Sequence, residues 1–396
     1  PYSGGKNMNA HFATQFVDAN GDWVDLVNHK NITADIAPTA GQMVRAFGLA
    51  YASKVFRSSA HKESFKHLSN DGNEVCFCTI GDASTSEGQF WEVINAAGVL
   101  QVPLVVFVFD DGYGISVPTA LQTTKGSISQ ALAGMKKEEH TNGLHIYTVK
   151  GWDYAGMCEI FELGIDQART SHEPVVFHVE ELTQPQGHST SGSHERYKSA
   201  ERLEWERTWD CNAKMREWII ANQLSTNEQL QELELEVKQE VRDAKNRAWE
   251  KYSQPIKDKV QELYQLATEG QDEGVIASVQ EILKDLLVNK EPLKRDILRF
   301  GNILLENMPM HSNKMAIQQF LLEYKNFHLP YYSQYLYDQS PKSTLNVPVI
   351  EATYSSAPQV LNGYEILNKY FDALFESNPK VYAFGEDVGT IGDVNQ

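Results

Sequence analysis

Two short clusters of aspartate and glycine interrupt otherwise apolar stretches of the sequence. The first is "GDAS" at residues 81–84, after the apolar run "EVCFCTI", and the second is "DDGYG" at residues 110–114, after "LVVFVF". Carboxylate oxygens are hard ligands that suit Mg²⁺, which binds through one or two carboxylates and completes its shell with phosphate and water. Glycines allow the backbone to approach a bulky ligand. The two clusters therefore predict a site for magnesium and a diphosphate.

The spacing of the two clusters suits one edge of a parallel sheet. Asp82 and Asp111 are 29 residues apart, about the length of one strand–helix–strand unit. Loops at the carboxyl ends of parallel strands form the ligand crevice, so we expect the two carboxylates to converge there. Without a cation they would repel each other and raise one pKa, whereas a divalent ion removes that cost. A helix beginning near residues 84–88 would direct free backbone amides at the anion.

Alternating helices and strands supply the frame for these clusters from about residue 33 to residue 182. Strands are predicted at "EVCFCTI", "LVVFVF", "LHIYTV" and "PVVFHVEEL". Helices are predicted across "AGQMVRAFGLAYASKVF", "SEGQFWEVINAAGVLQ" and "YAGMCEIFELGIDQA". Strands separated by helices indicate right-handed crossovers and a mostly parallel sheet covered on both faces. The predicted fold class is therefore α/β, a parallel sheet flanked by helices.

The region from residue 205 to about residue 328 is acidic and helical instead. In "STNEQLQELELEVKQEVRDAKNRAWEKY" we expect Ser225 and Glu228 to form a capping box. Apolar residues then recur at spacings of three and four, at Leu230, Leu233, Val237, Val241, Ala244 and Ala248. Further helices are predicted over residues 260–266, 276–288, 293–306 and 314–324.

Charge, hydropathy and cysteine content exclude several classes of protein. The formal net charge of −18 argues against a nucleic-acid-binding protein, because phosphate neutralisation requires clustered Lys and Arg. The apolar run at residues 102–109 is far shorter than the roughly 20 residues that cross a bilayer, so no membrane association is expected. The four cysteines form no CxxC pair, which favours reduced thiols and a cytoplasmic location.

The stretch that contains both clusters resembles a known cofactor-binding motif. "GDASTSEGQFWEVINAAGVLQVPLVVFVFDDGYGIS" is similar to the thiamine-diphosphate motif, which begins Gly-Asp-Gly and ends in Asn-Asn. Its form resembles the α part of the decarboxylating component of 2-oxo acid dehydrogenase complexes. The segments "YSGGKNMNAHF", "ADIAPTAGQMVRAFGLAYA" and "GHSTSGSHERYKS" resemble further parts of that family, in the same order. The resemblance extends from residue 1 to about residue 250.

The resemblance implies a magnesium site. Asp82 and Asp111 would bind Mg²⁺ through their carboxylates, and Tyr113 through its backbone carbonyl. The sequence departs from the family at Asp111, where the family usually carries Asn, and at Gln184, where it carries an Arg that contacts the phosphates. Asp111 adds a negative charge, which should tighten metal binding while opposing the diphosphate.

The resemblance also implies contacts to the organic part of the cofactor. Three residues would meet the diphosphate and two would present their backbone to the aminopyrimidine; these are Gly81, Ala83 and Ser84, and Ala37 and Thr39, respectively. His188 would lie near the reacting thiazolium carbon as the catalytic residue. An imidazole there can hydrogen-bond the decarboxylated intermediate and assist acyl transfer to a lipoyl group.

The C-terminal residues resemble the start of the β part of the same enzyme. There, the helix "NGYEILNKYFDALFESNP" precedes the predicted strand "KVYAFGED", which runs into "GEDV" at residues 385–388. We therefore expect an α-like diphosphate- and magnesium-binding domain at residues 1–204, a helical extension and linker at 205–345, and the start of a β-like pyrimidine-binding domain at 346–396. The chain would then be a fragment of a fused enzyme, with α-like and β-like parts on one polypeptide.

The function implied by the resemblance is oxidative decarboxylation of a 2-oxo acid with thiamine diphosphate and Mg²⁺. The acyl group would pass to a lipoyl-bearing dihydrolipoyl acyltransferase, and the fused chain would form a homodimer. An acetoin-type or other thiamine-dependent enzyme is one alternative, and a non-catalytic helical assembly module is another. The sequence does not choose between pyruvate and branched-chain oxo acids.

Overall fold

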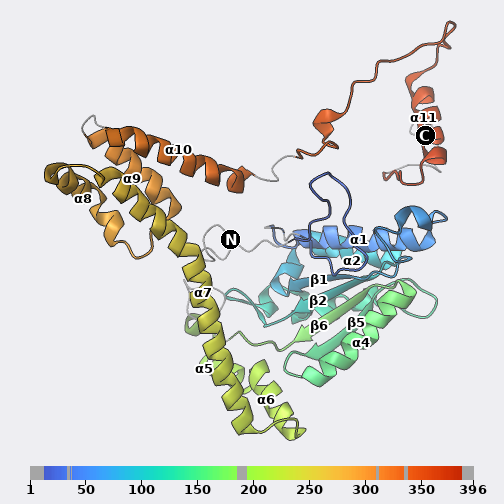
Figure 1. The fold of residues 1–396 in the computed structure, drawn as a ribbon. Helices are drawn as coiled ribbons and strands as arrows, with labels where there is room; N and C mark the ends of the chain where they lie inside the picture. The colour runs from blue at the N-terminus through green and yellow to red at the C-terminus, as the bar shows by residue number, and fades with distance from the viewer. Residues whose placement is uncertain are drawn as a thin grey trace. The chain divides into compact units, whose positions relative to one another are not determined.

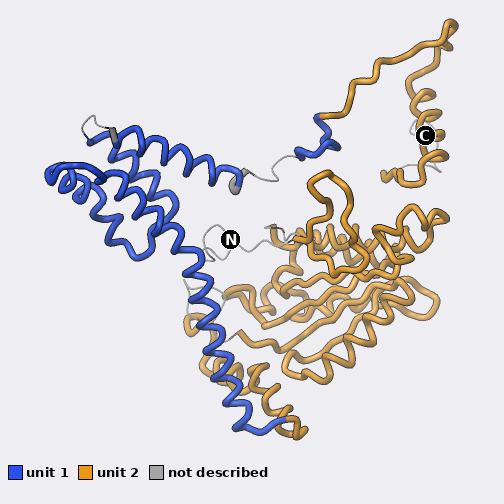
Figure 2. Tube along the Cα trace, viewed as in Figure 1, with its two compact units in different colours: residues 1–11, 225–345 blue, residues 12–224, 346–396 orange. Residues whose placement is uncertain are grey.

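The structure, a computed structural model, describes residues 13–33, 36, 38–184, 194–308, 312–333 and 338–385. The chain divides into two compact units, shown in Figure 2. The α/β unit contains residues 12–224 and 346–396, and the helical unit contains residues 1–11 and 225–345. The domain boundaries that the sequence suggests, after residues 204 and 345, stay predictions.

A four-stranded parallel sheet forms the core of the α/β unit (Figure 1). Its strands are β1 (Cys76–Gly81), β2 (Leu104–Phe109), β5 (His145–Lys150) and β6 (Val175–Glu180). They lie in the order β1-β2-β6-β5, and each neighbouring pair is parallel. The predicted α/β class with a parallel sheet is confirmed. Because every pair is parallel, the carboxyl ends of all four strands lie at one edge.

Helices pack on both faces of the sheet because the strand residues alternate in direction. Val106 and Val108 of β2 pack with α1 (Gly41–Ser58) and α2 (Gly88–Leu100). Val105 and Phe107 pack with α4 (Tyr154–Ser171) on the other face. A strand that is buried on both faces consists of consecutive apolar residues, which explains the continuous apolar run in the sequence. Each fully buried apolar side chain of this kind contributes about 1.5–3 kcal/mol.

Shorter elements complete the α/β unit. They are β3 (Tyr113–Gly114), β4 (Val117–Pro118), α3 (Ile128–Ala131), α5 (Ala200–Thr208), α6 (Cys211–Ala221) and α11 (Gly363–Ser377). The predicted C-terminal helix is confirmed by α11, which begins with a capping box. The predicted strand that follows is wrong for residues 381–385, which carry no strand pairing. A strand requires a hydrogen-bonded neighbour as well as apolar residues. Residues 386–388 lie outside the described residues.

The described residues of the helical unit form the α-helices α7 (Asn227–Thr268), α8 (Glu273–Val288), α9 (Lys294–Asn307) and α10 (Ser312–Ser333). Their apolar side chains form a single buried cluster, which includes Val260, Leu263, Leu283, Ile297, Leu304 and Ile317. Across the part of the chain that the structure describes, none of the helices combines the length and the apolar character needed to span a membrane.

Helix α7 differs from the prediction in two respects. It runs through Pro255 as one helix of 42 residues, whereas the sequence analysis predicted separate helical segments at residues 225–252 and 260–266. Its capping box is formed by Thr226 and Gln229, one residue later than the predicted Ser225 and Glu228. Gln229 N–H donates to the Thr226 hydroxyl (3.3 Å), while the Ser225 hydroxyl bonds the Gln229 side chain (3.1 Å). Two adjacent residues can both cap, and their side-chain partners decide between them.

Candidate functional site

The two aspartate clusters meet at the carboxyl ends of β1 and β2. Gly81 pairs with Phe109 in register, and the Asp82 N–H donates to the Phe109 carbonyl (3.1 Å). Gly114 of the second cluster packs so closely on the first that a Cβ atom there would lie 2.7 Å from Cβ of Ala83. Only glycine fits this contact. The structure therefore brings the two clusters together.

The carboxylates of this site lie in surroundings that disfavour negative charge. Asp82 is buried, and its Oδ2 accepts a hydrogen bond from the Thr119 hydroxyl (3.0 Å). Burial raises the pKa of Asp82 to about 7, and the charges of Asp110 and Asp111 contribute further to the rise. Burial also raises the pKa of Asp111, against a hydrogen bond from the Tyr113 N–H and the positive charge of Lys198. A bound cation would relieve this cost.

A tight turn presents the second cluster. Gly112 has a φ of +82°, in the left-handed region that favours glycine. Its N–H donates to Oδ1 of Asp110 (2.8 Å), and the Tyr113 N–H donates to Oδ1 of Asp111 (3.2 Å). The pairing of β3 with β4 continues from this turn. Side-chain acceptors of both aspartates thus fix the backbone that carries Asp111 and Tyr113.

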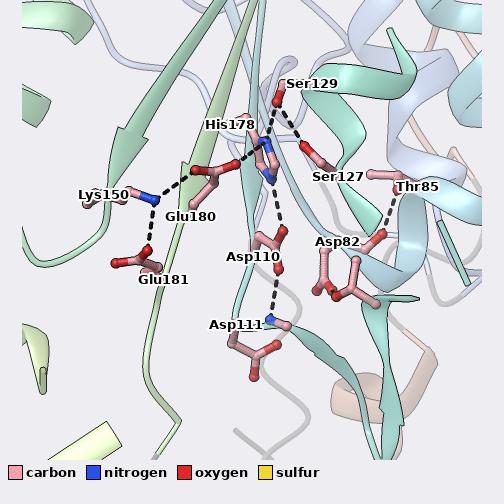
Figure 3. A network of polar contacts seen from close by, with 12 residues as sticks. Asp82, Thr85, Asp110, Asp111, Ser127, Ser129, Lys150, His178, Glu180 and Glu181 are labelled. Carbon is pink, nitrogen blue, oxygen red and sulfur yellow. Dashed lines mark hydrogen bonds and ion pairs between the residues drawn. The ribbon is translucent and has the colours of Figure 1, made fainter. Parts of the chain in front are cut away.

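A buried histidine, which the sequence reasoning missed, holds Asp110 (Figure 3). His178 of β6 is 1% exposed, and its Nε2 lies 2.9 Å from Oδ2 of Asp110. Its Nδ1 lies 2.9 Å from the Ser129 hydroxyl and 3.4 Å from Oε1 of Glu180. With Asp110 ionised, Nε2–H is the donor to the carboxylate. The feature of the sequence that could have indicated this histidine is its position as a polar residue inside the apolar predicted strand "PVVFHVEEL".

The polar array extends from His178 along the strand ends (Figure 3). Lys150, at the end of β5, places Nζ 3.1 Å from Oε2 of Glu180 and 2.8 Å from Oε1 of Glu181. The indole N–H of Trp152 donates to the other Glu181 oxygen (2.8 Å). Opposite charges and hydrogen bonds thus pair the polar groups on this side of the sheet edge. In the aspartate clusters, by contrast, burial disfavours the charged form of Asp82 and Asp111.

Arg202 of α5 and Lys198, which lies just before this helix, bring two cations to the second cluster. Arg202 donates from Nη2 to the Asp111 carbonyl (2.7 Å), and Lys198 lies 5.0 Å from the centroid of the Tyr113 ring. Both cations also contact Oε1 of Glu206, at 3.0 Å from Nε of Arg202 and 2.7 Å from Nζ of Lys198. Sequence reasoning gave these residues no role, although Lys198 lies within the "GHSTSGSHERYKS" segment and Arg202 and Glu206 closely follow it.

The remaining predicted cofactor residues surround the same edge. Ala83 and Ser84 lie in a 3-10 turn (Ala83–Ser86) after the exposed Gly81. The N-cap residue of α2, Glu87, makes no side-chain capping bond, so the first amides of α2 are suited to an anion.

The structure describes only part of the predicted aminopyrimidine and catalytic positions. Thr39 is exposed in the turn before α1, and the neighbouring Gln42 side chain donates to the Thr79 carbonyl of β1 (3.2 Å). The start of α1 therefore reaches the strand that carries the first cluster. Ala37 and His188 lie outside the described residues.

The donor set is incomplete for a metal held by protein alone. Within the described ranges, no group of three or more His, Cys, Asp or Glu residues is arranged to hold a metal ion. Two carboxylates and a backbone carbonyl form a partial set, which Mg²⁺ typically completes with phosphate oxygens and water. A cavity of about 350 Å³ lies elsewhere, between α2 and residues 134–143, and we assign it no role because no member of the aspartate clusters lines it.

Comparison with known proteins identifies a family and several relatives. The profile of the family described as "Dehydrogenase E1 component" matches residues 10–257. The chain is 26% identical over 246 residues to 2-oxoisovalerate dehydrogenase subunit alpha 2, mitochondrial, of Arabidopsis thaliana, covering 61% of this chain and 44% of that protein.

Two further relatives are named for pyruvate. The testis-specific mitochondrial pyruvate dehydrogenase E1 component subunit alpha of Rattus norvegicus is 27% identical over 202 residues, 50% of this chain and 48% of that protein. The pyruvate dehydrogenase E1 component subunit alpha of Rickettsia bellii is 24% identical over 181 residues, 46% of this chain and 53% of that protein. The chain thus spans about half the length of these curated relatives.

Proposed function

Because the chain belongs to the dehydrogenase E1 component family, we propose that it acts in thiamine-diphosphate-dependent oxidative decarboxylation of a 2-oxo acid. The acyl group would pass to the lipoyl group of a partner dihydrolipoyl acyltransferase. One observation carries the proposal: Asp82 and Asp111 lie at the same edge of the sheet, and burial raises the pKa of both. A site that concentrates negative charge in this way is suited to a divalent cation and its anionic ligand.

The residues present fit magnesium and a diphosphate. Two carboxylates and the Tyr113 carbonyl are oxygen donors, and burial of Asp82 makes neutralisation by a cation favourable. The uncapped start of α2 and the exposed backbone at Gly81 suit the diphosphate. Lys198 and Arg202 add positive charge beside the cluster, but both are engaged by Glu206. We therefore assign the metal to Asp82, Asp111 and Tyr113.

The roles that we propose for this chain's own residues are those that the family resemblance implies. When bound, thiamine diphosphate supplies the electron sink for decarboxylation. Ala83 and Ser84 would orient the diphosphate, and the backbone of Ala37 and Thr39 would orient the aminopyrimidine. His188 would hold a proton near the reacting carbon and deliver it during acyl transfer.

The substrate and the assembly are parts of the same proposal. The relatives named above for 2-oxoisovalerate and pyruvate make these two acids the first substrates to compare. The proposed assembly is a homodimer of a fused chain that carries α-like and β-like parts. The free state of all four cysteines supports a reducing, cytoplasmic location.

Calorimetric titration with thiamine diphosphate and Mg²⁺ tests the proposal. We expect saturable binding that Asp82→Ala weakens at least about 100-fold, since removing a metal ligand leaves one carboxylate to hold the ion. Asp166→Ala is the matched control, because Asp166 is an exposed aspartate of α4. Absence of binding by the wild-type chain, or equal binding by wild type and Asp82→Ala, would refute the proposal.

A further inference from the structure

Helix α7 carries an apolar stripe that is covered in one half and exposed in the other. In the carboxyl-terminal half (residues 251–268), Ile256, Val260 and Leu263 are buried in the core of the helical unit. In the amino-terminal half (residues 227–250), the exposed fractions are 52% for Leu233, 44% for Val237 and 62% for Val241. Apolar surface of this extent along one side of a helix is typical of an interaction site.

The exposed stripe has a regular period. Its members are Leu230, Leu233, Val237, Val241, Ala244 and Ala248. Successive members are separated by three, four, four, three and four residues. This is an 11-residue repeat, close to the natural period of an α-helix, so the stripe stays on one side of a nearly straight helix. Such a seam is suited to pairing with another long helix.

Charge along the same half is distributed unequally. Residues 227–240 contain five Glu and one Lys, a net charge of −4. Residues 241–250 contain three Lys or Arg and two acidic residues, a net charge of +1, and Lys251 follows directly after them. Two copies of this helix that run in opposite directions would place the acidic segment of each beside the basic segment of the other. Two parallel copies would place like charge beside like charge.

We propose that the amino-terminal half of α7 is a dimerisation surface, whose occupant is the same helix of a second copy of this chain, running antiparallel. A two-fold axis near residue 239 then pairs the stripe with itself. It places Leu230 opposite Ala248, Leu233 opposite Ala244, and Val237 opposite Val241. A large side chain faces a small one, or two medium ones meet, so each layer fills a similar volume.

One charged pair follows from this register. Glu234 and Lys245 each lie four residues after a member of the stripe, at Leu230 and Val241, so they flank it on the same side. In the antiparallel pair, Glu234 of one copy reaches the level of Lys245 of the other. The interface is independent of the aspartate site, so it exists whether or not the chain is catalytic.

Analytical ultracentrifugation of the 396-residue chain tests the proposal. We expect a dimer, and we expect Leu233→Glu combined with Val241→Glu to raise its dissociation constant at least about 100-fold, because four charges would enter the seam. Both side chains are exposed, so the circular dichroism of the variant should match wild type. Leu235→Glu is the control: Leu235 is 68% exposed but lies on the opposite side of the helix, and its variant should remain dimeric.

Two further variants test the direction of pairing. Lys245→Glu should weaken the dimer, and adding Glu234→Lys should restore it. Under oxidation, Leu233→Cys should crosslink to Ala244→Cys in a mixture of the two variants, and neither should crosslink to itself. A wild-type monomer at all concentrations, equal loss of dimer in Leu235→Glu, or self-crosslinking of Leu233→Cys would overturn the proposal.

Discussion

The two units bury different kinds of side chain. Among the described residues, every buried Asp, Glu, His or Lys side chain lies in the α/β unit: Asp82, His172, His178, Lys198 and Glu206. Among the described residues of the helical unit, the buried side chains are apolar apart from serines and Tyr324. Burying a charge is costly unless a partner or ligand compensates for it. The difference indicates that the α/β unit gives up stability to form a binding site, whereas the helical unit is built for stability and association.

The largest expected effect is on the helical core. Leu263 of α7 is fully buried, and Leu263→Ala should lower the free energy of unfolding by about 2–5 kcal/mol, because it leaves a cavity among packed helices. Leu235→Ala on the exposed side of the same helix should change it by less than about 0.5 kcal/mol. Urea denaturation followed by circular dichroism measures both. Equal effects of the two substitutions would contradict the packing described here.

The aspartate site should show the opposite behaviour, in which removing a charge increases stability. Because the folded pKa of Asp82 is raised to about 7, the folded protein binds more protons than the unfolded chain between about pH 4 and pH 7. Stability of the ligand-free protein should therefore fall as the pH rises through this window, by on the order of 1–4 kcal/mol.

Asp82→Asn isolates this contribution, since the amide keeps the size of the side chain and an acceptor for Thr119. Its unfolding free energy should change less than that of wild type between pH 5 and pH 8, in urea titrations without Mg²⁺. A wild-type protein that becomes more stable over this range, with Asp82→Asn following the same curve, would contradict the assigned burial of charge.

Replacing His178 should have a smaller effect, which should lower both the stability of the protein and its affinity for the cofactor. His178→Ala leaves Asp110 without its histidine donor, which should cost about 1–3 kcal/mol of stability. It should also weaken binding of thiamine diphosphate and Mg²⁺, because Asp110 fixes the Gly112 turn. His178→Gln can place an amide N–H near the position of Nε2 and should recover part of both losses. If His178→Ala changed stability but left affinity unaltered, the histidine would have no part in positioning the site.

The sequence predicts the frame of the site better than its supporting contacts. Apolar runs that end in "GDAS" and "DDGYG" were sufficient to predict parallel strands with aspartates at one edge. The bond between His178 and Asp110 spans 68 residues, and Arg202 reaches the Asp111 carbonyl across 91. No local pattern encodes contacts at such separations, so they emerge only from the packed sheet.

Local signals also failed where two outcomes have similar energies. Ser225 and Thr226 can each cap a helix, and the hydrogen bonds of Gln229 select Thr226. The low helix propensity of proline favours a break in the helix at Pro255, but the packing of the residues that follow it keeps α7 continuous. Residues 381–385 have the composition of a strand without the pairing that a strand requires.

Locating the metal directly is the strongest test of whether Asp82 and Asp111 form one cation and diphosphate site. A crystal of this chain grown with Mn²⁺ and thiamine diphosphate would reveal the ion by its anomalous scattering. We expect one strong peak coordinated by both carboxylates, the Tyr113 carbonyl and the diphosphate. A peak bound elsewhere, or a diphosphate held without contact between the ion and these two aspartates, would contradict this expectation.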